Sequence, residues 1–202
     1  MDQRPDVNFS DQLEGWLGGD APKTLGALGD VVGEKSFAVT ILFLMFVPAL
    51  PLPTGGITHV FEAITVVIAA QMVLGRRTLW LPQRWQQREL GAITTGKAVP
   101  FMIRRIRWFE KFSRPRGARL FDQVWFLRLL GLVLMGFAIA AAVAPPFSGL
   151  DTLPGLGAVA VALSIILEDV VVLGIGLAIG AAGIALILTI GAALLHFLRD
   201  LF

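Results

Sequence analysis

Long uncharged stretches are the feature that most constrains how this chain can fold. Four stretches contain no Asp, Glu, Lys or Arg: residues 36–61, 129–150, 152–167 and 170–198. A helix needs roughly 20 apolar residues to cross the hydrocarbon core of a bilayer, so several of these stretches can span or enter a membrane. Hydrophobic residues make up 55% of the chain and charged residues only 16%, which is atypical of soluble domains. The sequence therefore predicts an all-α, polytopic integral membrane protein.

Two Pro/Gly-rich segments interrupt these apolar stretches. The first is PALPLPTGG at residues 48–56, which contains Pro48, Pro51, Pro53, Gly55 and Gly56. The second is APPFSGLDTLPG at residues 144–155, which contains Pro145, Pro146, Pro154 and Gly155. Proline lacks a backbone N–H and blocks helix continuation, so a helix that only had to cross the bilayer would avoid such segments. We therefore predict two broken helical hairpins related as a rough internal repeat.

The breaks allow two interpretations. Each could be an aqueous turn between spanning helices, or the tip of a re-entrant hairpin that enters the membrane and returns to the same side. The arms of the first hairpin favour re-entry, because residues 37–47 give about 16 Å of helix and residues 63–75 about 20 Å, against a core of about 30 Å. Paired interrupted segments are also typical of transporters, whose binding sites lie near the middle of the membrane.

Charge separates the remaining chain into an acidic and a basic segment. Residues 1–35 contain seven acids and three cations, whereas residues 76–120 contain twelve Lys or Arg and two Glu. The positive-inside rule predicts that the basic segment is cytoplasmic. Within it, apolar residues fall largely on one side of a helix and cations on another: Phe101, Met102, Ile106, Phe109 and Phe112 against Arg104, Arg107 and Lys111. This pattern suits contact with anionic lipid headgroups better than contact with nucleic acid.

These features predict four parts of the chain. They are an acidic amphipathic segment at the cytoplasmic surface (1–35), a first broken membrane hairpin (36–75), a basic amphipathic linker (76–120), and a second broken hairpin followed by a Gly-rich transmembrane helix (121–202). In the last helix, Gly176 and Gly180 form a small-xxx-small pair, which permits close helix contact within the chain or across a homodimer.

Ionisable residues in apolar surroundings are the main functional candidates, because a charge inside a membrane helix costs roughly 2.5–3.5 kcal/mol on insertion scales. Glu168 and Asp169 interrupt an apolar stretch, where they could serve a translocation pathway or be a solvated helix end. His59 and Glu62 lie three residues apart on one helix face. They could relay a proton or hold a cation, or Glu62 could simply satisfy the first turn of the helix.

Two further polar residues complete the candidate set. Arg128 precedes the 129–150 stretch, where it could snorkel to lipid headgroups or could bind Glu168, Asp169 or a lipid phosphate. Gln71 could bond to the opposite hairpin or hold neighbouring helices together.

Residues that commonly carry catalysis or bind metals are scarce. The chain has no cysteine and two histidines, and it contains no HExxH, GxSxG or P-loop motif. We therefore predict no enzyme activity, no cofactor and no metal site. Helices that begin after 53–56 and after 154–157 would instead direct free backbone amides and a positive dipole end toward an anionic guest.

Three stretches resemble one protein family. KTLGALGDVVGEKSFAVTILFLMFVPALPLP (23–53), AAQMVLGRRTLWLP (69–82) and ILEDVVVLG (166–174) together resemble the bacterial exopolysaccharide synthesis protein ExoD family. The middle stretch carries the Q-x-x-L-G-R-R-x-x-W-L-P signature. The resemblance implies a multi-pass protein of the inner, cytoplasmic membrane linked to exopolysaccharide production. Val170 departs from the glycine that often follows the Glu-Asp pair, and His59 and Glu62 do not look typical of the family.

The sequence leaves two functional hypotheses. In the first, a transporter or flippase-like protein binds and translocates an anionic lipid-linked intermediate of the polyprenyl-phosphate type. In the second, a non-catalytic assembly or regulatory partner acts within the membrane machinery that makes the polysaccharide.

Overall fold

The computed structural model describes residues 9–24, 27, 31–50, 57–76, 79–80, 87, 96, 99–111, 116–145 and 148–201, and the account below concerns these residues. Within them the chain forms helices and contains no strand, which confirms the all-α prediction. The predicted break residues Pro51, Pro53, Gly55, Gly56 and Pro146 lie outside the described residues.

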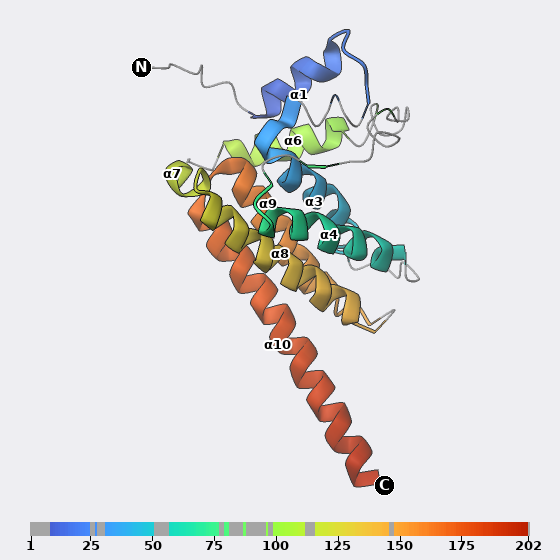
Figure 1. Cartoon of the computed structure of the whole chain (residues 1–202). Helices are drawn as coiled ribbons and strands as arrows, with labels where there is room; N and C mark the ends of the chain where they lie inside the picture. Colours follow the sequence, from blue (N-terminus) through green and yellow to red (C-terminus); the bar gives the residue numbers. More distant parts are fainter. Residues whose placement is uncertain are drawn as a thin grey trace.

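The helices differ widely in length. In chain order they are α1 (Phe9–Gly18), the 3-10 turn η1 (Gly33–Lys35), α3 (Ser36–Phe46), α4 (Ile57–Val73), α6 (Val99–Glu110), α7 (Ala118–Phe121), α8 (Val124–Val143), α9 (Thr152–Leu167) and α10 (Val170–Leu201). Figure 1 shows α10 projecting far beyond the other helices, with α1 and α6 at the opposite end of the molecule.

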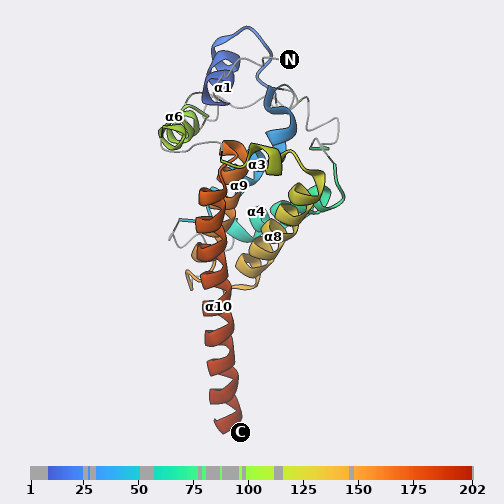
Figure 2. The ribbon, with the colours of Figure 1, turned by 90° about the vertical axis from the view of Figure 1, so that its left-hand side faces the viewer.

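The two predicted hairpins pack into a ring of four helices. Helix α3 packs on α4 and α9, and α8 packs on the same two helices. In Figure 2, α4 and α8 lie side by side, next to α9 and α10. The two hairpins therefore occupy equivalent positions in the ring: α3 corresponds to α8, and α4 corresponds to α9. Both hairpins also point the same way, because the start of α3 meets the end of α9 through Lys35 and Glu168.

Small residues set the distances between these helices. A Cβ on Gly131 of α8 would lie 2.8 Å from the Cβ of Met72 in α4, so only glycine permits this approach. Fully buried Ile41, Met45 and Leu134 belong to the same core. The ring is therefore closely packed by apolar side chains.

The glycine face of α10 is filled within the chain. A Cβ on Gly176 would lie 2.8 Å from the backbone nitrogen of Val161 in α9, and Gly180 packs against the ring of Phe137 in α8. Close contact is thus made inside one molecule, the first of the two alternatives for Gly176 and Gly180. The homodimer that the sequence also allowed stays a prediction.

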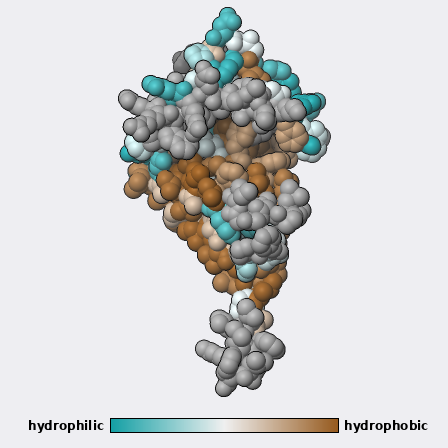
Figure 3. Space-filling view, turned by 90° about the vertical axis from the view of Figure 1, so that its right-hand side faces the viewer, coloured by the Kyte–Doolittle hydropathy of each residue, from teal (hydrophilic) through white to brown (hydrophobic). Residues whose placement is uncertain are grey.

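Among the described residues, two helices are long and apolar enough to cross a membrane, by length and composition: Val124–Val143 and Val170–Ala193. Helices α3, α4 and α9 are apolar but shorter. Only 22% of the apolar span of α10 is buried, and large side chains such as Ile175, Leu188 and Ile190 are exposed along it. A core helix of a soluble protein would instead be mostly covered. Figure 3 shows hydrophobic residues over the middle of one face and hydrophilic residues toward the end that carries α1.

The second hairpin differs from the prediction at the start of α9. This helix begins at Thr152, before Pro154, whereas the sequence suggested a start after residues 154–157. The prediction was wrong because proline is tolerated in the first turn of a helix, where its missing N–H has no intrahelical acceptor.

Candidate functional site

The described parts of the two breaks meet in one place. Pro48 and Ala49, which follow α3, are buried against Gly155 in the first turn of α9. A Cβ on Gly155 would lie 3.0 Å from the backbone nitrogen of Ala49. Pro154 in turn packs on Gly183 of α10, where a Cβ would lie 2.6 Å from the proline Cδ. We call these five residues the tip junction.

The turn in the second break is exposed. Pro145 and Ser148 both face outward, and Ser148 Oγ donates a hydrogen bond of 2.6 Å to the Pro145 carbonyl. The second break therefore has a sheltered side at Pro154 and Gly155 and an outward-facing turn before it.

A buried polar group lies beside the tip junction. Glu62 is 0% exposed, and its Oε2 lies 2.7 Å from His59 Nδ1. Its other oxygen, Oε1, is buried and has no hydrogen-bond partner among the described residues. Asp151 at the N-cap of α9 makes no capping bond with its side chain, and its carboxylate repels that of Glu62. Thr152 Oγ1 is likewise buried without a partner. We call His59, Glu62, Asp151 and Thr152 the tip cluster.

The sequence indicated only half of the tip cluster. The i,i+3 spacing pointed to His59 and Glu62. Asp151 and Thr152 went unnoticed, because Asp and Thr before an apolar helix are ordinary capping residues. Only the packing of α4 and α9 around α3 and α8 brings an acid from each hairpin into one region.

Glu168 and Asp169 form the corner between α9 and α10. Asp169 is 2% exposed, and its Oδ1 accepts a hydrogen bond of 2.9 Å from the backbone N–H of Val171, so it caps α10. Glu168 has a left-handed backbone with φ of 54°, and its Oε1 lies 2.8 Å from Lys35 Nζ. Its carbonyl accepts a hydrogen bond of 3.1 Å from Gly117 N–H. Both acids thus hold the ends of neighbouring segments together.

Arg128 and Gln71 lie at the same end of the ring as this corner. The guanidinium of Arg128 packs on Gly75, whose φ of +79° permits no ordinary side chain. The cation at Glu168 is Lys35 and not Arg128. Gln71 Oε1 accepts a hydrogen bond of 3.0 Å from Trp80 N–H, so it bonds to the segment after its own helix and not to the opposite hairpin.

A small groove opens beside Arg128. It is bounded by α3, the end of α4, the start of α8 and α9. Its lining is mostly apolar, with Arg76 and Asp122 as the charged residues. Its lining residues are Phe37, Ala38, Met72, Gly75, Arg76, Asp122, Val124, Leu127 and Ile165.

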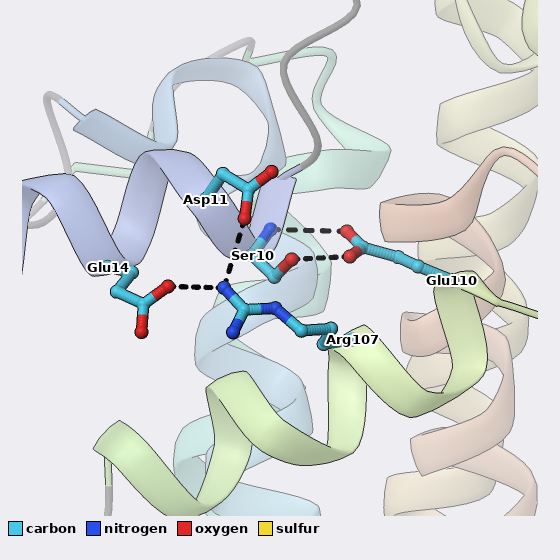
Figure 4. A network of polar contacts seen from close by, with 5 residues as sticks. All are labelled: Ser10, Asp11, Glu14, Arg107 and Glu110. Carbon is cyan, nitrogen blue, oxygen red and sulfur yellow. Dashed lines mark hydrogen bonds and ion pairs between the residues drawn. The ribbon is translucent and has the colours of Figure 1, made fainter.

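The acidic and basic amphipathic segments bind each other (Figure 4). Arg107 of α6 donates to Asp11 Oδ1 at 2.9 Å and to Glu14, both on α1. Ser10 donates to the carboxylate of Glu110 from its backbone N–H, at 3.1 Å, and from its hydroxyl. The hydrogen bond to Glu14, followed by the charges of Glu14 and Asp11, raises the pKa of Arg107 above its ordinary value.

Helix α6 presents two apolar sides instead of the single one predicted. Ile103 and Ile106 are buried, whereas Phe101, Trp108 and Phe109 are exposed. The grouping of Ile106 with Phe101 and Phe109 was wrong, because α1 covers the inner side of α6 with its own apolar residues.

Metal-ligating side chains do not gather in the described part of the chain. No group of three or more His, Asp or Glu residues there could hold a metal ion.

Comparison with known proteins identifies the family. The family described as "Exopolysaccharide synthesis, ExoD" matches residues 9–189, which include both hairpins and the tip cluster. This chain belongs to the ExoD family. It is similar to Protein ExoD of Rhizobium meliloti, with 28% identity over 168 residues that cover 80% of this chain and 68% of that protein. It is also similar to an uncharacterized protein of Synechocystis sp., with 29% identity over 150 residues that cover 73% of this chain and 68% of that protein.

The family resemblance predicted from three sequence stretches is thus confirmed. The ExoD family description ties the chain to exopolysaccharide synthesis. No solved structure matches the chain significantly.

Proposed function

We propose that this ExoD-family chain is a multi-pass inner-membrane protein that binds and translocates an anionic lipid-linked intermediate of exopolysaccharide synthesis, of the polyprenyl-phosphate type. The observation that carries this proposal is the position of the tip junction along α10. Two broken hairpins that end beside a projecting apolar helix suit a protein that opens a polar path part-way through a membrane.

The depth of the junction follows from helix geometry. Thirteen residues separate Val170 from Gly183, which is about 20 Å of helix. Helix α10 then continues for about 27 Å from Gly183 to Leu201. With Val170 at the cytoplasmic surface, the tip junction lies inside a hydrocarbon core of about 30 Å. On this proposal both hairpins are re-entrant. Burial shelters the irregular backbone at Pro48 and Pro154, and the exposed turn at Pro145 and Ser148 then has to line a water-filled path.

The charges of the described residues lead us to propose that the anionic headgroup binds at the end opposite the tips. Glu62 and Asp151 lie at the tips, where two carboxylates repel a phosphate. We therefore move the anion site away from the helix starts at the tips. Arg76 borders the apolar groove, and Arg128 packs on Gly75 in its lining. These two cations outnumber the one carboxylate in the lining, Asp122, and cations beside an apolar groove suit a phosphate that is attached to a hydrocarbon chain.

The exposed side of α6 forms a second cationic surface. Arg104 and Arg105 are exposed beside Phe101 and Trp108, and the Arg105 guanidinium lies 5.2 Å from the Phe101 ring centroid. Cations and aromatic rings together favour the interface of an anionic membrane, at about 1 kcal/mol per cation. This arrangement supports a cytoplasmic linker that rests on the membrane surface.

Binding of polyprenyl phosphate to the full chain in nanodiscs of neutral lipid tests the proposal. The double variant Arg76→Gln/Arg128→Gln should bind at least about tenfold more weakly, because each charge-assisted hydrogen bond contributes about 1.5–3 kcal/mol. Arg119→Gln, an exposed cation of α7, is the matched control and should bind normally.

Translocation is measured with the same variants in liposomes that contain a labelled polyprenyl phosphate. We expect the unchanged chain to speed movement of the label across the bilayer. The double variant should not speed it. Equal binding and movement in every variant, with exopolysaccharide production impaired in cells, would contradict the proposal and indicate an assembly or regulatory partner instead.

A further inference from the structure

We propose that the tip cluster is a proton-binding site that couples the two hairpins, with Glu62 as the residue that takes up the proton. This proposal goes beyond lipid handling, and proton binding can be measured without any lipid substrate. It rests on the geometry of Glu62, His59 and Asp151, which come from both hairpins.

An incomplete set of hydrogen bonds singles out Glu62. The side chain is fully buried, Oε2 is bonded to His59, and Oε1 has no partner among the described residues. A buried acceptor without a donor costs roughly 1–3 kcal/mol, and more when it is charged. A proton on Oε1 removes the charge and converts the oxygen into a donor.

The balance of charges in the cluster also favours uptake of a proton. With His59 protonated and both acids ionised, the cluster keeps one unbalanced negative charge. The neighbouring helices supply no cation to compensate it. Helices α3 and α9 contain no charged residue, and α10 contains none before residue 199. Arg128, the one charged residue of α8, packs on Gly75 at the other end of the ring. One proton makes the cluster neutral.

A proton fits the cluster better than a metal ion. The described residues contain no group of three or more His, Asp or Glu that could hold a metal. The imidazole of His59 is 32% exposed, so it connects the buried Glu62 to the outside. A proton can therefore pass through the imidazole to the carboxylate, as histidines do in proton shuttles.

Protonation acts on both hairpins because the two acids belong to different ones. Glu62 lies in α4 of the first hairpin, and Asp151 begins α9 of the second. The two carboxylates repel each other when both are ionised. A proton on Glu62 removes that repulsion, so the separation of the hairpin tips depends on pH.

The test uses the natural absence of cysteine. A single Ser148→Cys substitution in the exposed turn carries an environment-sensitive fluorophore, and the full chain is titrated with acid in nanodiscs. We expect one sigmoidal change of fluorescence that Glu62→Gln abolishes. Asp151→Asn should shift the midpoint to lower pH, because it removes a negative charge that helps Glu62 hold its proton. Glu110→Gln, a carboxylate at the opposite end, should leave the titration unchanged.

Infrared difference spectra of the chain without the fluorophore provide an independent readout. Acidification should produce the signal of a protonated carboxyl group that is absent in Glu62→Gln. If Glu62→Gln does not fold, the Asp151→Asn shift and the infrared signal of the unchanged chain decide the question. A titration that persists in folded Glu62→Gln, or one that follows sodium concentration at constant pH, would overturn the proposal. Neither outcome depends on whether the chain moves a lipid.

Discussion

Gly157 of α9 lies so close to Gly180 of α10 that a Cβ on Gly157 would be 2.5 Å from the Gly180 Cα. The two backbones are therefore in direct contact, and this pair sets the distance between the helices. Close packing of small residues is a main source of helix association in membranes, where lipid is as apolar as the side chains.

Replacement of Gly157 should consequently destabilise the bundle. Gly157→Ala forces α9 and α10 apart at a fully packed point, with an expected cost of about 1–3 kcal/mol. Gly174→Ala on α10 is the control, because a Cβ there meets no atom within 4 Å. Thermal unfolding of the purified chain should show a lower midpoint for Gly157→Ala alone. Equal midpoints would mean that the contact does not limit stability.

Glu168 allows a comparison between backbone strain and an ion pair. Its left-handed backbone costs about 1–2 kcal/mol for a residue other than glycine, whereas the partly exposed pair with Lys35 contributes about 0.2–1 kcal/mol. Glu168→Gly relieves the strain while losing the pair, and Glu168→Ala loses the pair while keeping the strain. We expect the Gly variant to be more stable than the Ala variant by about 1 kcal/mol, measured by denaturant unfolding.

Asp169 should act through its cap. Asp169→Ala removes the acceptor for Val171 N–H and should cost about 0.5–2 kcal/mol, while Asp169→Asn retains a capping oxygen and should cost less. Amide hydrogen exchange at the start of α10 measures this directly. If Asp169→Asn loses lipid translocation while its exchange stays normal, the acid has a role beyond capping.

The contact between α1 and α6 should weaken when Arg107 loses its charge. Trp16 is buried in α1, so release of the helix in Arg107→Gln should shift Trp fluorescence to longer wavelength and speed proteolysis before residue 31. Arg104→Gln, an exposed cation on the same helix, serves as the control. Added salt should reproduce part of the effect, since it screens exposed charges.

The raised pKa of Arg107 predicts how the contact between α1 and α6 responds to pH. The pKa of Arg107 is raised above its ordinary value, so its contribution is fully present below that value and is lost only as pH rises through the raised pKa. Neutral to mildly alkaline pH should therefore leave α1 bound to α6. Release of α1 between neutral and mildly alkaline pH would contradict the assigned pair.

Labelling of single cysteines tests the depth of the hairpin tips. Leu50 is 37% exposed on the protein, yet on our proposal it faces the membrane interior beside the tip junction. Leu50→Cys in intact cells should react with an apolar maleimide and not with a charged one. Arg105→Cys should react with the charged reagent only from the cytoplasmic side. Rapid reaction of Leu50→Cys with the charged reagent from the periplasm would show that the break is an aqueous turn.

Local patterns were sufficient for much of the fold. Uncharged stretches predicted the positions of α3, α4, α8 and α10, because a helix in an apolar environment must satisfy its own backbone. The i,i+3 spacing predicted that His59 and Glu62 share a face, and the Glu-Asp pair marked the corner between α9 and α10. The start of α9 was misplaced, since Pro154 ends a helix in most positions but is tolerated in the first turn.

Local sequence patterns did not predict the contacts between segments that are far apart in the chain. The sequence by itself determined that the chain is helical, largely apolar and a member of the ExoD family. Only the tertiary structure decided that Asp151 approaches Glu62, that Lys35 instead of Arg128 meets Glu168, and that α1 covers α6. The physical reason is that hydrophobic periodicity acts over neighbouring residues of one helix, whereas a charge finds its partner through the packing of helices far apart in the chain.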